Sequence, residues 1–117
     1  MAAPNIVNVV TITGKTAVQA VGTSATAIVT NSAASGKVFK VNALYVSNVD
    51  GTAAADITVD LFRSSTAYAI ASTIQVPADA TLDLMSKAIY LEEGDVLRCT
   101  ASAAGDLVAV CSYEEIS

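Results

Sequence analysis

Residues 36–62, GKVFKVNALYVSNVDGTAAADITVDLF, decide the fold of this chain. They hold two runs, 38–49 and 56–62, in which apolar and polar side chains alternate. A period of two with many β-branched and aromatic residues is typical of strands that bury one face. Between the runs, Asp50-Gly51 has the residue types of a chain reversal. The stretch therefore predicts the central antiparallel pair of strands in an all-β domain. In the first run, the alternation places four side chains on one face: Phe39, Val41, Ala43 and Tyr45.

The rest of the chain carries shorter runs of the same kind, separated by turn residues. These predicted strands cover residues 5–13, 16–21, 24–31, 66–76, 81–85, 89–91, 96–102 and 107–113. The predicted turns include Gly14-Lys15, Ser64-Ser65 and residues 92–95. Residues 66–76 are rich in alanine, but Ser72, Thr73 and the closing Val76-Pro77 favour an extended chain over a helix. The spacing of strands and turns predicts a single-domain antiparallel β-sandwich, jelly-roll-like, over residues 1–117, with residues 1–4 as a flexible lead.

The composition is unusually poor in charge. Hydrophobic residues make up 53% of the 117 residues, charged residues only 15%, and the mean hydropathy is +0.55. Such a balance predicts that part of the surface is covered by another subunit or by a partner. The net charge is −5, and the six basic residues are scattered along the chain. Nucleic-acid binding, which needs clustered Lys and Arg, is therefore not expected.

The chain shows no signal for export or for membrane insertion. The first ten residues, MAAPNIVNVV, lack the basic region and the apolar core of a secretory signal. No uninterrupted apolar run has the length of a membrane span. We expect assembly in the cytoplasm and no membrane partner. In that compartment the two cysteines are expected to be reduced.

The residue types also argue against catalysis. The chain contains no histidine, which excludes Ser-His-Asp and Cys-His sites and most zinc sites. Glu92-Glu93 and Glu114-Glu115 are adjacent pairs, and neighbouring residues of a strand point to opposite faces. Neither pair can converge on one substrate atom, so both are predicted to be solvated carboxylates. Glu92, Glu93 and Asp95 around Gly94 offer oxygen ligands to calcium, but they lack the ligand spacing of known calcium loops. We predict no catalytic, cofactor-binding or metal-binding residue.

Cys99 and Cys111 fall in the last two predicted strands. Pairing these strands about Ala104 would set Leu97 opposite Cys111 and Cys99 opposite Ala109, all of them apolar pairs. This register predicts two buried thiols as diagonal neighbours, acting as small hydrophobic side chains rather than as a disulfide. With no histidine to activate them, neither is a predicted nucleophile.

Three asparagines lie on or beside predicted strands: Asn31, Asn42 and Asn48. Asn42 in mid-strand needs a partner for its amide, in a neighbouring loop or across a subunit interface. Asn48 is expected to shape the Asp50-Gly51 turn. Sugar binding would require exposed aromatic residues, and alternation assigns several of the six available to the core.

Two stretches resemble a known family. AIVTNSAASGKVFKVNALYVSNVDGTAAADITVDLFRS and VPADATLDLMSKAIYLEEGDVLRCTASAAGDLVAVCSYEEIS are similar to small virion structural proteins of tailed bacteriophages, especially T4-like cyanophages. The most characteristic motif of the resemblance lies in the second stretch. It consists of an Ile-x-Leu run, an acidic turn, Gly-Asp and Leu-Arg. These positions are Ile89, Leu91, Gly94, Asp95, Leu97 and Arg98.

The resemblance implies a non-enzymatic β-sandwich that assembles on a phage particle. It favours a capsid decoration or cement-like protein located in the virion, a homo-oligomer with a trimer favoured, in contact with the major capsid protein or other virion proteins. A tail or fibre component that binds a host-surface glycan is the alternative. The loop of residues 32–36 and the arm of residues 1–8 are the predicted contact segments, because polar loops and free arms commonly carry assembly contacts.

Overall fold

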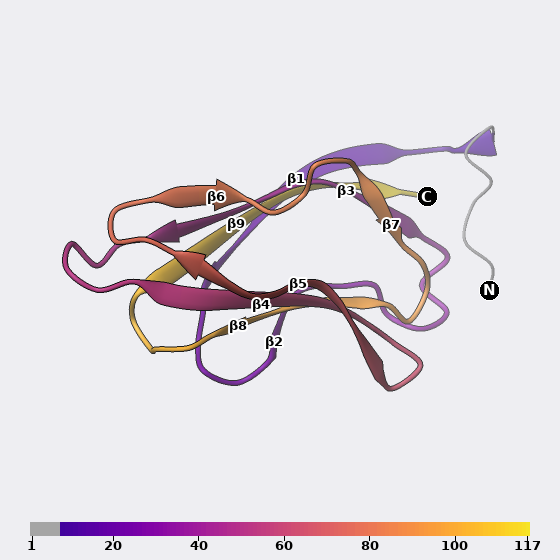
Figure 1. Ribbon diagram of the computed structural model, residues 1–117. Helices are drawn as coiled ribbons and strands as arrows, with labels where there is room; N and C mark the ends of the chain where they lie inside the picture. Colours follow the sequence, from indigo (N-terminus) through magenta and orange to yellow (C-terminus); the bar gives the residue numbers. More distant parts are fainter. Residues whose placement is uncertain (1–7) are drawn as a thin grey trace.

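The computed structural model describes residues 8–117, which form two antiparallel β-sheets packed face to face (Figure 1). Sheet A has five strands: β1 (Ile12–Ala20), β9 (Leu107–Ile116), β3 (Val38–Asn48), β6 (Thr81–Asp83) and β7 (Ile89–Leu91). Sheet B has four: β2 (Thr26–Thr30), β8 (Val96–Ala101), β4 (Ala55–Arg63) and β5 (Thr66–Val76). The orders are β1-β9-β3-β6, with β7 also on β3, and β2-β8-β4-β5. This is the order of a jelly roll in which β6 and β7 share the place of one strand. The predicted all-β antiparallel sandwich is confirmed.

The core lies between the two sheets and is built from aliphatic side chains. On β4 and β8 the alternation is regular, and Ile57, Val59, Leu97 and Cys99 are fully buried. β9 contributes residues of the same kind from the opposite sheet. Because the central strands bury alternate residues, the two facing sheets fill the interior of residues 8–117 without a helix.

The predicted pairing of residues 38–49 with 56–62 is wrong. β3 lies in sheet A and β4 in sheet B, so the link of residues 49–54 passes from one sheet to the other. The side-chain amide of Asn48 fixes this crossing, donating to the carbonyl oxygens of Ala53 (2.9 Å) and Val76 (3.0 Å). Alternation shows that a strand has a buried face, but both runs can bury that face in one core from opposite sides.

The predicted common face of Phe39, Val41, Ala43 and Tyr45 is also only half right. Phe39 and Val41 are buried, but the register against β9 shifts between Val41 and Ala43. The extra residue of this β-bulge moves the following side chains to the other face. Leu44 and Val46 therefore enter the core, and Tyr45 is 44% exposed.

The N-terminal strand is displaced from its prediction. Of the predicted strand 5–13, residues 5–7 lie outside the described part of the chain, as does the lead of residues 1–4. β1 runs straight through Gly14-Lys15, where a turn was predicted. It pairs with β9 over its whole length, from Ile12 opposite Ile116 to Ala20 opposite Val108. A long neighbouring strand thus overrides a local turn signal.

Several other predictions hold. Residues 66–76 are extended as β5, and Ser64 and Ser65 form the turn before it with φ of 51° and 61°. Gly94, with φ of 89°, provides the positive φ that the turn before β8 requires. The predicted pairing of the last two strands is wrong, because β8 pairs with β2 and β4 while β9 pairs with β1 and β3. Cys99 and Cys111 are nevertheless both buried and free, as predicted, and they enter the core from opposite sheets.

Candidate assembly surface

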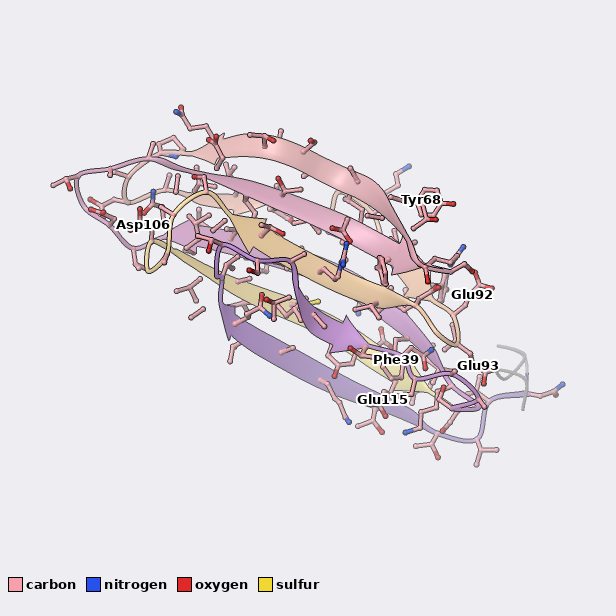
Figure 2. All side chains as sticks on the ribbon, turned by 90° about the horizontal axis from the view of Figure 1, so that it is seen from below. Phe39, Tyr68, Glu92, Glu93, Asp106 and Glu115 are labelled. Atoms are coloured by element: carbon pink, nitrogen blue, oxygen red, sulfur yellow. The ribbon has the colours of Figure 1, made fainter. Side chains whose placement is uncertain are left out.

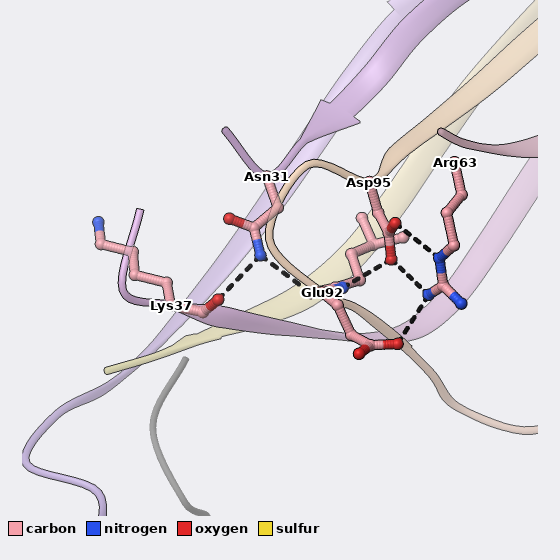
Figure 3. Close-up of polar contacts among 6 residues, drawn as sticks. Asn31, Lys37, Arg63, Glu92 and Asp95 are labelled. Atoms are coloured by element: carbon pink, nitrogen blue, oxygen red, sulfur yellow. Dashed lines mark hydrogen bonds and ion pairs between the residues drawn. The ribbon is translucent and has the colours of Figure 1, made fainter. Parts of the chain in front are cut away.

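The acidic turn before β8 is part of an ion-pair cluster (Figure 3). Arg63, at the end of β4, donates Nε to Asp95 Oδ1 (2.8 Å) and Nη2 to Asp95 Oδ2 (2.6 Å) and to Glu92 Oε2 (2.9 Å). The backbone N–H of Glu92 also donates to Asp95 Oδ2 (2.8 Å). Asp95 is 2% exposed. Its carboxylate therefore closes the turn and ties it to sheet B.

The pKa shifts in this cluster show that Arg63 and Asp95 stabilise each other in their charged forms. Burial favours the neutral form of Asp95, but the hydrogen bonds from Arg63 and from the Glu92 N–H outweigh it and lower the pKa of the carboxyl. The hydrogen bond to Asp95 likewise raises the pKa of Arg63. The Asp95 carboxylate is buried, and its two oxygens accept three hydrogen bonds from groups of the fold itself.

The other predicted carboxylates also bond within the fold. Glu115 accepts from Lys15 Nζ (2.7 Å) and Lys37 Nζ (3.0 Å), and the bond to Lys15 contributes most to the lowered pKa of Glu115. Asn42 has a partner for its amide, as predicted, but on the adjacent strand β9 and not in a loop or across an interface: Glu114 Oε1 accepts from Asn42 Nδ2 (3.0 Å). Glu93 Oε2 accepts from the N–H of Gly36 (2.9 Å). The two acidic pairs thus point to different partners.

Residues 8–117 contain no group of three or more Cys, Asp or Glu side chains arranged to hold a metal ion, and no pocket opens on their surface. Over the same residues there is no helix long and apolar enough to cross a bilayer. Burial raises the pKa of Cys99 to about 12 and that of Cys111 to about 11. At neutral pH both side chains are therefore thiols rather than thiolates.

Two buried asparagines organise the loops. Asn31 donates its amide to the carbonyl oxygens of Lys37 (2.9 Å) and Leu91 (3.0 Å), as Figure 3 shows for Lys37. Its Oδ1 accepts from the hydroxyl of Ser35 (2.5 Å), so the loop of residues 32–36 is bonded internally. Asn48 Oδ1 accepts from the N–H of Asp50 (2.9 Å), which confirms its predicted role in the turn. The part of the predicted contact arm that falls on residues 1–7 lies outside the described chain.

Part of the outer face of sheet A is free of charge. Cross-strand pairing aligns nine outward-facing residues of β1, β9 and β3 in three rows. We call these nine residues the sheet A face: Thr16, Ser112 and Ala43; Val18, Val110 and Tyr45; Ala20, Val108 and Ser47. Val18 is 72% exposed, although it is aliphatic. No member of the sheet A face carries a charge.

Charged residues border the sheet A face rather than entering it. Lys40 and Glu114 are opposite each other in the row toward β7, and Asp83 lies opposite Tyr45 on β6. The outer face of sheet B is different, because Arg98 donates Nε to Asp60 Oδ1 (2.8 Å) at its centre. The Arg98 guanidinium also stacks 4.0 Å from the ring centroid of Phe62. A patch without charge that is bordered by charged residues is the pattern of a protein–protein contact, whose centre is depleted in charge.

The sequence predicted covered surface and assigned contacts to the loop of residues 32–36 and the arm of residues 1–8, but it did not point to the sheet A face. The sheet A face combines residues from three strands far apart in the chain, and its rows depend on the β3 bulge, which alternation alone did not reveal. The best signal in the sequence for this face was the absence of charged residues from two runs, 16–20 and 107–112. Each run is preceded by one charged residue, Lys15 and Asp106 respectively.

Comparison with known proteins finds a similar fold among solved structures but assigns the chain to no family. No family model and no curated protein matches this chain. Among solved structures, the chain is similar in fold to one described under the words "Bacillus endospore appendages form a novel family of disulfide-linked pili". The TM-score is 0.55 at 15% identity, over 98% of this chain and 95% of the other. The likeness spans the whole sandwich.

Proposed function

We propose that this chain is a non-enzymatic structural subunit that assembles with copies of itself and with a larger protein particle. The observation that carries the proposal is the sheet A face, an uncharged surface with exposed Val18 and Tyr45 on a chain with only 15% charged residues. In a single copy, the apolar parts of Val18 and Tyr45 are exposed to water. A partner that covers them would bury this apolar area, which is favourable.

The particular assembly that we propose is a phage particle. The resemblance to cyanophage virion proteins, carried by residues 89–98, makes a capsid decoration or cement-like role the first candidate, with the major capsid protein as partner. The similarly folded Bacillus chain is described as part of pili, which supports a self-assembling structural role for this sandwich and says nothing of the particle. The trimer favoured by the resemblance remains a prediction.

A tail or fibre component that binds a host glycan is the second candidate, and one observation favours it. Three tyrosines are exposed, Tyr45 by 44%, Tyr68 by 56% and Tyr90 by 42%. They lie on β3, β5 and β7. Tyr90 is opposite Lys40, five residues along β3 from Tyr45, so the two backbone positions are roughly 17 Å apart along the sheet. Tyr68 lies on sheet B, so the three tyrosines are not grouped on one sheet, and we rank this candidate second.

The test is binding of the purified chain to isolated cyanophage heads, followed by sedimentation and a count of copies bound per shell. A decoration protein is expected to saturate at a regular copy number. Tyr45→Glu adds charge to the sheet A face and is expected to weaken binding at least about tenfold, because it buries an unpaired carboxylate. Tyr68→Glu, on the exposed edge strand of sheet B, is the matched control and should leave binding unchanged.

One result would overturn the first candidate, and another would overturn the role of the sheet A face. One is the absence of saturable binding to heads together with retention of the chain on host cells or glycans, which supports the second candidate. The other is equal binding by the Tyr45→Glu and Tyr68→Glu proteins, which would remove the sheet A face from the contact.

A further inference from the structure

We propose that β1 pairs antiparallel with β1 of a second copy, about a two-fold axis at Thr16, and so joins two A sheets into one continuous sheet. This inference rests on the proposed self-assembling function and names the contact through which the copies meet. It is carried by the edges of the sheets, by the direction of the backbone groups of β1, and by the match of β1 to itself.

Among the described strands, β1 is the edge that lacks protection against pairing. Proteins block sheet edges with short strands, bulges, prolines or charges. β6 and β7 have three residues each, and β2 has five with a register shift. β5 is long but carries two register shifts against β4. β1 has nine residues, an uninterrupted register with β9, no proline and one charge.

The backbone of β1 presents a regular set of open groups. Thr11 and Ser117 exchange both backbone hydrogen bonds (2.9 Å each), and Val21 N–H donates to Leu107 (2.9 Å). Hydrogen-bonded pairs recur at every second residue of an antiparallel ladder. Odd-numbered residues of β1 therefore bond to β9, and even-numbered residues direct N–H and C=O away from the sheet. The open groups belong to Ile12, Gly14, Thr16, Val18 and Ala20.

A two-fold axis at Thr16 satisfies all of these groups at once. It pairs Thr16 with Thr16, Gly14 with Val18 and Ile12 with Ala20 of the second copy. Each of the five even residues then exchanges its N–H and its C=O, which gives ten hydrogen bonds, two for each of five pairs. The side chains fit too, since each large exposed residue, Val18 at 72% and Ile12 at 54%, lies opposite a small one.

The charges of β1 allow this approach. Lys15 is the single charged residue of the strand, and the two-fold register places it opposite Ala17 of the second copy. Its ammonium already bonds to Glu115 on its own β9 (2.7 Å). No like charges are set directly opposite each other. The other long edge, β5, is bulged and offers no such straight partner, so the self-complementary partner for β1 is a second β1.

The arrangement of the molecule leaves this edge accessible. In Figure 2 the indigo strand β1 runs along one margin of the molecule, and β5 lies along the opposite margin. Within residues 8–117, no backbone group of the even residues of β1 has a hydrogen-bond partner on another strand. An isologous contact closes at two copies, so it favours a dimer or a higher even number over a trimer.

Hydrogen–deuterium exchange on the unaltered protein tests the pairing. We expect the amides of Gly14, Thr16 and Val18 to exchange at least about tenfold more slowly at about 100 μM than at about 1 μM, because pairing closes their open N–H groups. The amides of Lys15 and Ala17 bond to β9 in both conditions and should not change. Equal exchange of the even amides at both concentrations would overturn the inference.

Substitution at the axis provides a second test. Thr16→Pro removes an N–H that faces away from β9, so it spares the β1–β9 ladder, and prolines are tolerated at such edge positions. We expect this variant to keep its β-sheet circular dichroism and to have the mass of a monomer. Thr16→Val retains the N–H and is the matched control, expected to keep the mass of the unaltered protein. If Thr16→Pro does not fold, Gly14→Lys, which places a lysine on the open edge outside the sheet A face, takes its place.

The outcomes separate this inference from the proposed function. If a folded Thr16→Pro or Gly14→Lys protein has the same oligomeric mass as the unaltered protein, the self-assembling subunit is retained and β1 pairing is overturned. A monomer at every concentration for the unaltered chain overturns both the pairing and the self-assembly. A lower native mass in the edge variants, with the native mass of the Thr16→Val protein unchanged, supports the pairing.

Discussion

Buried polar side chains determine how the loops of this sandwich are held. Asn31, Asn48, Asp60 and Asp95 are the buried polar residues of the described chain, and each has hydrogen-bond partners on another segment. Sequence reasoning identified Asn48 as a turn residue because Asp50-Gly51 begins two residues after it. It did not find the Arg63–Asp95 pair, since 32 residues separate the partners and only the sheet B topology brings them together.

Replacement of Asp95 by Asn is predicted to destabilise the fold by roughly 1–3 kcal/mol at pH 7, because it breaks a buried, bidentate ion pair. Chemical denaturation monitored by circular dichroism measures the loss. Glu92→Gln is the matched control, since Glu92 is the exposed partner of the same arginine and is expected to cost less than about 1 kcal/mol. Equal effects of the two substitutions would contradict the structural role of Asp95.

The same carboxyl predicts a pH dependence. The pKa of Asp95 is lower in the folded state than its ordinary value, so its stabilising contribution is present above about pH 4 and is lost as the pH falls through the folded pKa. The difference in unfolding free energy between the unaltered protein and Asp95→Asn should therefore shrink from pH 6 toward acid. A constant difference over that range would be inconsistent with an ionised Asp95.

The two thiols are predicted to be unreactive in the folded protein. Cys99 and Cys111 are fully buried, and burial raises their pKa to about 12 and about 11. A water-soluble aromatic disulfide reagent at pH 8 should label neither residue on a timescale of minutes and both in denaturant. Fast labelling of one thiol without denaturant would show that its strand opens locally.

At the level of strands, residue patterns predicted where strands occur in the chain better than they predicted which strands pair with each other. The extents of β7 and β8 agree closely with prediction because alternation and turn residues are local properties. The predicted pairings were wrong for β3 with β4 and for β8 with β9. Strands adjacent in the chain can belong to opposite sheets and still bury their apolar faces in the same core. The bulge at Asn42 was missed because it depends on the register with β9.

The link between β3 and β4 is predicted to depend on one side chain. Asn48→Ala removes three hydrogen bonds and leaves the carbonyls of Ala53 and Val76 without this donor, at a cost of roughly 2–4 kcal/mol. Asn42→Ala, at the exposed bulge, is the matched control and should cost less than about 1 kcal/mol. Thermal unfolding of the two variants compares them. A larger loss for Asn42→Ala would mean that the sheet crossing is held by other contacts.

On the scale of the whole molecule, composition predicted a covered surface and the fold locates a candidate for it. The sandwich places the Arg98–Asp60 pair on the outside of sheet B and leaves the sheet A face without charge. The open edge of β1 adjoins that face, so pairing of two copies would double its width. The sequence could not locate either surface, because both arise where β1 meets β9 in the folded sheet.

The native mass of the purified chain, measured by light scattering over a dilution series from about 100 μM to about 1 μM, is the most direct test of self-assembly. We predict a mass near twice the 11.9 kDa of one chain, or a higher even multiple, at the upper end of the series, with dissociation on dilution. A mass of three chains would support self-assembly but contradict two-fold pairing through β1. A monomer throughout the series would contradict the central claim that this sandwich assembles through its own uncharged surface.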